Sequence, residues 1–284
     1  MGGEDEAAAP GRIVTPTYAL GHTERELRRL ATQAALIDPM TRRFFLEAGI
    51  RPGMRLLDIG SGAGDVAFLA ADLVGPDGAV VGVDRVPAAL ATARARAEER
   101  SLSHVTFHEG DPGDLLFDEP FDAVVGRYIL MFQDRPAEFL HRVARHVKPG
   151  GPVVMHEPDW DGARSFPPAP LFDRSCDWIV RAVLAHGHAS RMGKALHETF
   201  VAAGLPAPTM GVDTLIGGGA KSAPLVGLMA DLTETLADEI ARQGIATHAE
   251  MNVDSLGRRM LDEAVALDSV LVGRYEIGAW CRKP

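Results

Sequence analysis

The chain has 284 residues, of which 46% are hydrophobic and 24% are charged, and these values exclude a disordered or fibrous protein. Its formal net charge of -10 would repel a phosphate backbone, so nucleic acid is not expected as a partner. Two cysteines exclude a disulfide scaffold. No apolar run approaches about 18 residues and no leader-like segment opens the chain, so we expect a cytoplasmic protein without a membrane partner.

Residues 1–49 are predicted to form a tail followed by a helical lid. Residues 1–12 show no periodicity, whereas from Thr23 to Ala35 apolar residues recur at helical spacing. Glu26 follows Thr23 by three residues and completes a capping-box pattern. A second, separate helix is expected over 41–48, because Gly49 follows it directly.

Residues 50–160 alternate short apolar strands with amphipathic helices, the pattern of a parallel sheet covered on both faces. The predicted fold is therefore a doubly wound α/β sheet. Strands are expected at 55–59, 79–83, 105–108, 121–125 and 153–155, and helices at 66–74, 88–100 and 137–147.

Beyond residue 160 the alternation stops. Helices are expected at about 171–186, 194–203, 223–242 and 252–267, with strands at 210–216 and 270–280. We expect these helices to form a cap over the ligand edge of the sheet, and the two late strands to complete the sheet. Three regions follow: the lid (1–49), a core that binds a cofactor (50–160), and the cap with the last strands (161–284).

The strongest functional signal is a buried strand that runs into a glycine-rich turn and then a helix. Such a turn brings the backbone against a ligand at a helix N-terminus. A dinucleotide fingerprint would place glycine at position 65, which is Asp, and Asp58 precedes the turn. Two carboxylates would repel a pyrophosphate and suit an ammonium or sulfonium group, so S-adenosyl-L-methionine is favoured over NAD. The turn comprises Gly60, Ser61, Gly62, Ala63 and Gly64.

Two more acids follow the next two strands. Asp84 lies 20 residues after Gly64, where a carboxylate can accept both ribose hydroxyls of an adenosine. Asp111 follows the third strand and can accept from an adenine amino group. Their neighbours Arg85 and Pro112 are counted as cofactor-binding residues with them.

Over about 50–160 the chain resembles the class I S-adenosylmethionine-dependent methyltransferases, in the small-molecule group related to the ubiquinone/menaquinone C-methyltransferases. The motifs are DIGSGAG, VVGVD, EGD, FDAVVGRYILMFQD and the VKPGG turn. The resemblance implies a seven-stranded sheet with an antiparallel last strand. It also implies that Asp58 and the three glycines of the turn surround the methionine part, with Asp84 at the ribose and Asp111 at the adenine.

Four further residues carry predictions with open alternatives. The N-terminal stretch resembles a bacterial subgroup in which a helix closes over the cofactor, so Tyr18, Arg29 and Gln33 either contact the cofactor or only pack the helix. Arg127, at the exit of the fourth strand, either pairs with the cofactor carboxylate or with an acid such as Asp58.

Methyl transfer depends mainly on positioning, so few catalytic side chains are needed. Glu157, fixed by the following proline, is the first candidate for a general base, and His156 is the second. Strand alternation sends one of the two away from the acceptor, and the alternative for Glu157 is to bind a loop.

Other clusters are interpreted as structural. His186-Gly187-His188 with His156 is not read as a metal site, and no metal is predicted. Four large residues of the cap are expected in the core rather than around an acceptor: Trp160, Phe172, Trp178 and Met229.

The sequence thus predicts S-adenosylmethionine-dependent methyl transfer to the oxygen, nitrogen or carbon of a small organic molecule. An NAD-dependent oxidoreductase is one alternative. A protein that binds S-adenosylmethionine without methylating, such as a cyclase or a sensor, is another. The acceptor is not specified, and a homodimer is left open.

Overall fold

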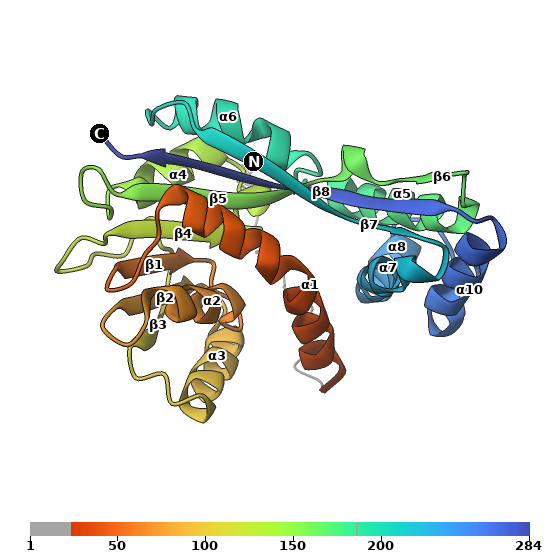
Figure 1. Ribbon diagram of the computed structural model, residues 1–284, viewed down its shortest axis with the longest axis horizontal. Helices are drawn as coiled ribbons and strands as arrows, with labels where there is room; N and C mark the ends of the chain where they lie inside the picture. Colours follow the sequence, from red (N-terminus) through yellow and green to blue (C-terminus); the bar gives the residue numbers. More distant parts are fainter. Residues whose placement is uncertain (1–23, 186) are drawn as a thin grey trace, which may run out of the picture.

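The computed structural model describes residues 24–185 and 187–284, which form one mixed sheet flanked by helices (Figure 1). The strands are β1 (Arg55–Ile59), β2 (Ala79–Asp84), β3 (Val105–Glu109), β4 (Ala123–Arg127), β5 (Pro152–Asp159), β6 (Arg164–Phe166), β7 (Thr209–Gly218) and β8 (Val270–Arg282). The longer helices are α1 (Glu24–Ala48), α2 (Asp65–Val74), α3 (Pro87–Glu99), α4 (Pro136–Ala144), α5 (Pro170–Ala185), α6 (Met192–Ala202), α7 (Ala223–Thr235) and α10 (Val253–Ala266). Shorter helical segments are α8 (Ala237–Arg242), α9 (His248–Met251), η1 (Leu130–Phe132), η2 (Trp160–Gly162) and η3 (Gly219–Ser222).

The sheet order confirms the predicted fold class. Strands run β3-β2-β1-β4-β5-β8-β6, and β7 pairs with the other edge of β8. The first five strands are parallel, and β8 is antiparallel to all three of its neighbours. The eighth strand, β6, was not expected, because three residues are too few to show a periodicity.

Strand alternation divides the core into two layers, one on each face of the sheet. Leu56 and Val154 pack with α1, α2 and α3, whereas their neighbours Leu57 and Val153 pack with α4 and α6. Figure 1 shows α2 and α3 on one side of the sheet and α4 and α6 on the other. The same alternation sends consecutive β5 residues to opposite faces.

The predicted break between two N-terminal helices is wrong, because α1 continues through Pro39. A proline inside a helix removes one hydrogen bond and bends the helix, but it need not end it. Ile37, Met40 and Phe44 are buried on either side of the proline, so tertiary packing holds both halves in one helix. Figure 1 shows the resulting change in direction of α1.

The cap helices α5, α7, α8 and α10 share a third hydrophobic cluster that extends to α1 and β8. Trp160, Phe172, Trp178 and Met229 all belong to this cluster, as expected for core residues. One predicted cap helix is placed differently: α6 contacts β5, β8 and α4, so it covers a face of the sheet. None of the helices within 24–185 and 187–284 has the length and apolar character needed to cross a bilayer.

Candidate functional site

The glycine turn after β1 has the backbone conformation that its sequence predicts. Gly60, Gly62 and Gly64 have φ angles of 68°, 51° and 92°, in the left-handed region that favours glycine. The backbone N–H groups of Gly60 and Ser61 both donate to the carbonyl of Val83, at 2.8 and 3.0 Å. The turn is therefore held against the end of β2.

Arg96 of α3 braces this turn from outside, a role that sequence reasoning missed. Its Nη1 donates to the carbonyl of Ala63 at 2.6 Å, and its Nη2 pairs with Asp65 Oδ1 at 2.7 Å. The guanidinium also lies 5.0 Å from the Phe68 ring centroid. Both bonds join residues more than 30 positions apart in the sequence, so no local sequence pattern predicts them.

Asp84 links the turn to the next loop. Its Oδ2 accepts the N–H of Gly62 at 2.8 Å, and its Oδ1 accepts the N–H of Val86 at 2.9 Å. A carboxylate has about four lone-pair sites, so both oxygens can still accept from a ligand. The carboxylate of Asp84, which is predicted to bind the ribose, is thus held at the end of β2 beside the turn.

Asp58 is the strand-end acid whose environment is most unusual. It is buried, and its Oδ2 and the neighbouring Ser61 Oγ have no partner among the described residues. Burial raises the pKa of Asp58 well above its usual range, against an opposing effect of Arg127. Buried polar atoms without partners are uncommon in folded proteins, and two of them lie together at the glycine turn, where a ligand or a water is expected to supply the missing bonds.

Asp111 has more partners than the sequence indicated. It pairs with Arg85, lies 3.7 Å from Arg142 Nη2, and accepts the N–H of Gly113 at 2.7 Å. The carbonyl of Pro112 accepts from His146 Nε2 at 2.9 Å. These arginines reduce the negative charge around Asp111. Of the three strand-end acids, Asp58 is the one that keeps an oxygen without a partner within the described chain.

Arg127 pairs with a neighbouring acid, as one of its two alternatives expected, but the acid is Asp38 and not Asp58; pairing with the cofactor carboxylate stays a prediction. Its Nη1 donates to Asp38 Oδ1 at 2.7 Å and to Thr41 Oγ1 at 3.0 Å, and both acceptors belong to α1. Asp58 is not one of its hydrogen-bond partners, although their charges interact. Arg127 therefore fastens α1 to the exit of β4.

His156 faces α1 and is fully buried. Its Nδ1 lies 3.0 Å from Thr41 Oγ1, and its Nε2 lies 3.0 Å from Glu276 Oε2 on β8. Burial lowers the pKa of His156, so the neutral ring is favoured. The base role predicted for His156 has no support from this geometry, because neither ring nitrogen is exposed.

Glu157 faces the opposite side of the sheet and holds the turn η1. Its Oε1 accepts the N–H groups of Ile129 and Leu130 at 2.9 and 2.7 Å, and its Oε2 accepts from Met131 at 3.4 Å. Burial raises its pKa to about 7, against the effect of these N–H donors. Glu157 is fully buried, and its contacts with residues 129–131 are those of the loop-binding alternative. A general-base role for Glu157 stays a prediction.

Three polar residues near His156 were not predicted: Arg274 and Glu276 are buried, and Tyr128 is partly buried. Tyr128 donates its hydroxyl to Glu276 at 2.7 Å, and Arg274 donates to both of them, at 3.0 Å to the Tyr128 hydroxyl and 2.8 Å to Glu276 Oε1. Tyr128 has a φ of 56°, an uncommon value for an aromatic residue that often accompanies a functional site. A usable signal was present, because Arg274 and Glu276 alternate within an otherwise apolar strand.

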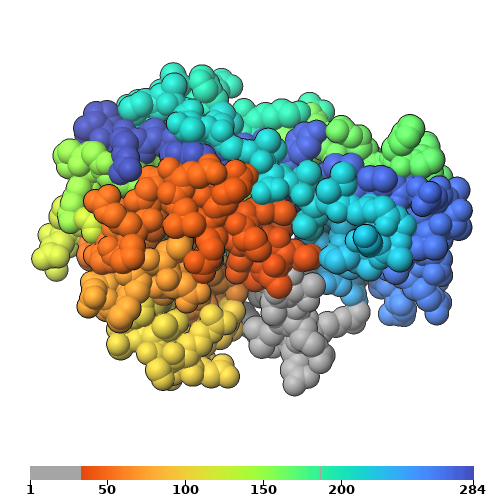
Figure 2. Space-filling model, viewed as in Figure 1, coloured from red at the N-terminus to blue at the C-terminus, as the bar shows by residue number. Residues whose placement is uncertain are grey.

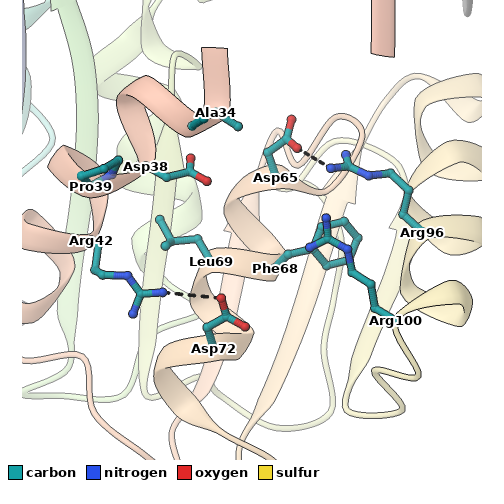
Figure 3. A pocket seen from close by; sticks show the side chains of 11 residues that line it. Ala34, Asp38, Pro39, Arg42, Asp65, Phe68, Leu69, Asp72, Arg96 and Arg100 are labelled. Carbon is teal, nitrogen blue, oxygen red and sulfur yellow. Dashed lines mark hydrogen bonds and ion pairs between the residues drawn. The ribbon is translucent and has the colours of Figure 1, made fainter. Parts of the chain in front are cut away.

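A groove of about 450 Å³ lies on the outer side of α2, between α1 and α3 (Figure 3). Figure 3 shows two ion pairs along it, between Asp65 and Arg96 and between Arg42 and Asp72. Asp38 also lines the groove, so the residue that binds Arg127 is reachable from this side. Asp38 is therefore shared by the groove and by the contact with Arg127.

The remaining predicted residues cannot be placed as cofactor contacts. Tyr18 and His186 lie outside the described residues, and the side chain of Arg29 is not described although its backbone belongs to α1. Gln33 is also in α1. Cofactor contact by Tyr18, Arg29 and Gln33 stays a prediction.

Residues 50–204, more than half of the chain, match the family model described as a methyltransferase domain. The chain belongs to the methyltransferase domain family. This membership confirms the class I S-adenosylmethionine-dependent methyltransferase resemblance that the motifs indicated.

Individual relatives of this methyltransferase-family chain match only parts of it. The nocamycin O-methyltransferase of Saccharothrix syringae is 38% identical over 130 residues, which cover 45% of this chain and 46% of the relative. The 2-phytyl-1,4-naphtoquinone methyltransferase of Synechococcus elongatus is 37% identical over 145 residues, 49% of this chain and 60% of the relative. The chain thus spans less than two thirds of the length of these curated relatives.

Among solved structures, the YcgJ protein from Bacillus subtilis has a TM-score of 0.52 at 20% identity. The match covers 87% of this chain and 98% of that protein. A likeness at this identity supports the fold of the methyltransferase-family chain and says nothing of its acceptor.

Proposed function

We propose that this protein transfers the methyl group of S-adenosyl-L-methionine to a small organic molecule. The observation that carries the proposal is the pair of buried, unpartnered polar atoms, Asp58 Oδ2 and Ser61 Oγ, beside a left-handed glycine turn. Membership in the methyltransferase domain family supports it. Nothing at this turn favours the alternative of an NAD-dependent oxidoreductase, because Asp65 stands where the dinucleotide fingerprint requires glycine.

The residues present fit this cofactor. Asp58 and Ser61 would hold its methionine part, Asp84 the ribose hydroxyls, and Asp111 with Arg85 and Pro112 the adenine side. Gly60 has a φ of 68°, so a larger residue would be strained there, and its Cβ would lie 2.6 Å from the end of the Ile129 side chain. When bound, the cofactor would supply an electrophilic methyl group on a sulfonium, with the neutral thioether S-adenosylhomocysteine as the leaving group.

The protein's own contribution is positioning and exclusion of water. Glu157 fixes the turn at residues 129–131 that follows β4, and Arg96 fixes the glycine turn. Two relatives are named for methylating nocamycin on oxygen and a phytyl naphthoquinone, which supports an organic acceptor of this general kind. A cytoplasmic location and a homodimer stay predictions from the sequence.

The test is incubation with S-adenosylmethionine labelled at the methyl group and a panel of acceptors: a phenol, a hydroquinone, a carboxylic acid and a primary amine. We expect label in at least one acceptor class, and much less of it with Asp84→Ala when the cofactor concentration is below saturation. The matched control is Asp77→Ala, an exposed acid in the turn before β2 that should transfer label as the parent does. A protein that binds the cofactor yet labels no acceptor would support the sensor or cyclase alternative instead.

A further inference from the structure

A continuous chain of hydrogen bonds crosses the interior from β8 to the exit of β4. It runs from Glu276 Oε2 to His156 Nε2 at 3.0 Å, from His156 Nδ1 to Thr41 Oγ1 at 3.0 Å, and from Thr41 Oγ1 to Arg127 Nη1 at 3.0 Å. We call these four residues the buried relay. They come from β8, β5, α1 and β4, elements that are separate in the sequence.

The buried relay lies under α1, which contacts both β5 and β8. In Figure 2 the α1 segment, in orange, lies across the face of the molecule. Thr41 and His156 are completely buried and Glu276 is 2% exposed. Removing one member of such a buried network leaves its other members without partners, so its residues depend on one another.

The bonds of Glu276 determine where the protons of the buried relay lie. Its carboxylate accepts from the Tyr128 hydroxyl at 2.7 Å and from Arg274 Nε at 2.8 Å. Although burial opposes ionisation, Arg274 and these bonds hold its pKa at about 2, so it is an anion that only accepts. His156 must then carry its proton on Nε2 and leave Nδ1 as an acceptor.

The neutral Nδ1 of His156 sets the direction of the Thr41 hydroxyl. The hydroxyl proton points to Nδ1, because the other acceptor within reach, the Ile37 carbonyl, is farther away at 3.3 Å. The lone pairs of Thr41 Oγ1 then face Arg127 Nη1. Every bond of the buried relay therefore donates toward Glu276, and the chain ends on the guanidinium of Arg127.

This arrangement aims Arg127. Asp38 and Thr41 hold Nη1 from two directions, and in the described chain all hydrogen bonds of the guanidinium are made through that nitrogen. Because the guanidinium is planar, fixing one corner fixes the direction of the remaining N–H groups. Gly126, the residue before Arg127, pairs in register with Ile59, so the backbone of Arg127 leaves β4 beside the start of the glycine turn, and the charge of Arg127 interacts with that of Asp58.

We propose that Thr41, His156 and Glu276 are positioning residues that aim Arg127 at the amino-acid carboxylate of a bound S-adenosyl compound. The inference rests on the proposed function. It replaces the catalytic role predicted for His156 with one exerted through Thr41 and Arg127. It also explains how a fully buried histidine can affect a ligand that it does not touch.

The test compares two ligands by calorimetry: S-adenosylhomocysteine, which carries the amino-acid carboxylate, and 5′-methylthioadenosine, which lacks it. Thr41→Val keeps the shape of the side chain and removes the hydroxyl. We expect it to weaken S-adenosylhomocysteine about tenfold or more and to change 5′-methylthioadenosine less than about twofold. Thr41→Ser, which restores the hydroxyl, should restore the affinity for S-adenosylhomocysteine.

The matched control is Thr233→Val in α7, a fully buried threonine whose hydroxyl donates to the Met229 carbonyl and takes no part in the buried relay. It should leave both affinities as in the parent. Equal weakening of both ligands by Thr41→Val, or of neither, would overturn the positioning role. Failure of the parent protein to bind either ligand would instead count against the proposed function.

A second measurement is made on the parent protein and uses a variant only to assign the signal. Nitrogen-15 NMR of the parent protein reports the tautomer of each histidine, and His156 is assigned through His156→Gln. We expect a neutral ring with the proton on Nε2. A proton on Nδ1 would reverse the direction of the buried relay and contradict the proposal.

Discussion

The two halves of the site are built in different ways. The glycine turn and Asp84 lie within 25 consecutive residues and are joined by backbone hydrogen bonds, such as that from Gly62 to Asp84 at 2.8 Å. The buried relay joins residues 115 and 120 positions apart through side chains. In the proposed function the first half binds a ligand largely with its backbone, and in the further inference the second half orients one cation from inside the core.

The two halves should therefore fail in different ways when mutated. Loss of a relay residue leaves buried groups without partners and should lower the stability of the whole protein. Loss of a residue at the turn removes contacts that a ligand uses and should lower affinity with less effect on folding.

The largest expected effect belongs to Glu276→Gln, which leaves Arg274 and His156 buried without their anion. We expect a loss of about 3–5 kcal/mol in the free energy of unfolding at pH 7. Urea denaturation measures it, with the exposed Glu119→Gln as the control expected to change little.

This prediction has a pH dependence of known sign. The pKa of Glu276 is lowered from 4.5 to about 2 in the folded state, so its stabilisation is present above about pH 4.5 and is lost as the pH falls toward 2. The difference between parent and Glu276→Gln should narrow over that range. A difference that stays constant down to pH 3 would mean that the carboxylate is not held as an anion.

The second-largest expected effect is that of Asp84→Ala on the affinity for the cofactor. Loss of charge-assisted hydrogen bonds should weaken S-adenosylhomocysteine by about 1.5–3 kcal/mol, or roughly 10- to 150-fold. Calorimetry measures the affinity. An unchanged dissociation constant would remove Asp84 from the ribose site.

Glu157→Gln separates holding a turn from acting as a base. The folded-state pKa of Glu157 is raised from 4.5 to about 7, so burial penalises its charged form and the parent should lose stability as the pH rises between these values. The variant should lack that loss, which we expect to be about 1–3 kcal/mol. The pH profile of turnover should stay the same, and a variant without turnover would restore Glu157 as a base.

The smallest expected effect is that of Arg96→Met, which keeps the apolar stem on Phe68 and removes the bond to the Ala63 carbonyl. We expect S-adenosylhomocysteine to bind about 0.5–1.5 kcal/mol more weakly. Arg94→Met is the matched control, because Arg94 donates to the Phe107 carbonyl and not to the turn. Equal effects of the two changes would mean that Arg96 acts through general helix packing.

The sequence predicted the parts of the molecule that short segments determine. The strand, the glycine turn and the acids at the ends of β1 and β2 follow from neighbouring residues, so the fold class and the family could be inferred. The continuity of α1 through Pro39 could not, because it depends on the burial of Ile37, Met40 and Phe44 against distant elements.

The buried relay was outside the reach of local patterns for the same reason. Thr41 lies in the helix segment expected at 41–48, but nothing near it in sequence indicates that it faces His156. Glu157 and His156 were selected from the sequence as candidate bases, and that role stays a prediction. Only the packing of η1 on one face and α1 on the other shows why each of them is buried.

The central claim, that the edge formed by Asp58, the glycine turn and Asp84 binds an S-adenosyl compound, is tested most directly by titrating the parent protein with S-adenosylhomocysteine in a calorimeter. The account predicts saturable heat at one ligand per chain, and none with NAD. Absence of heat with both S-adenosylhomocysteine and S-adenosylmethionine, from a protein shown to be folded, would contradict it.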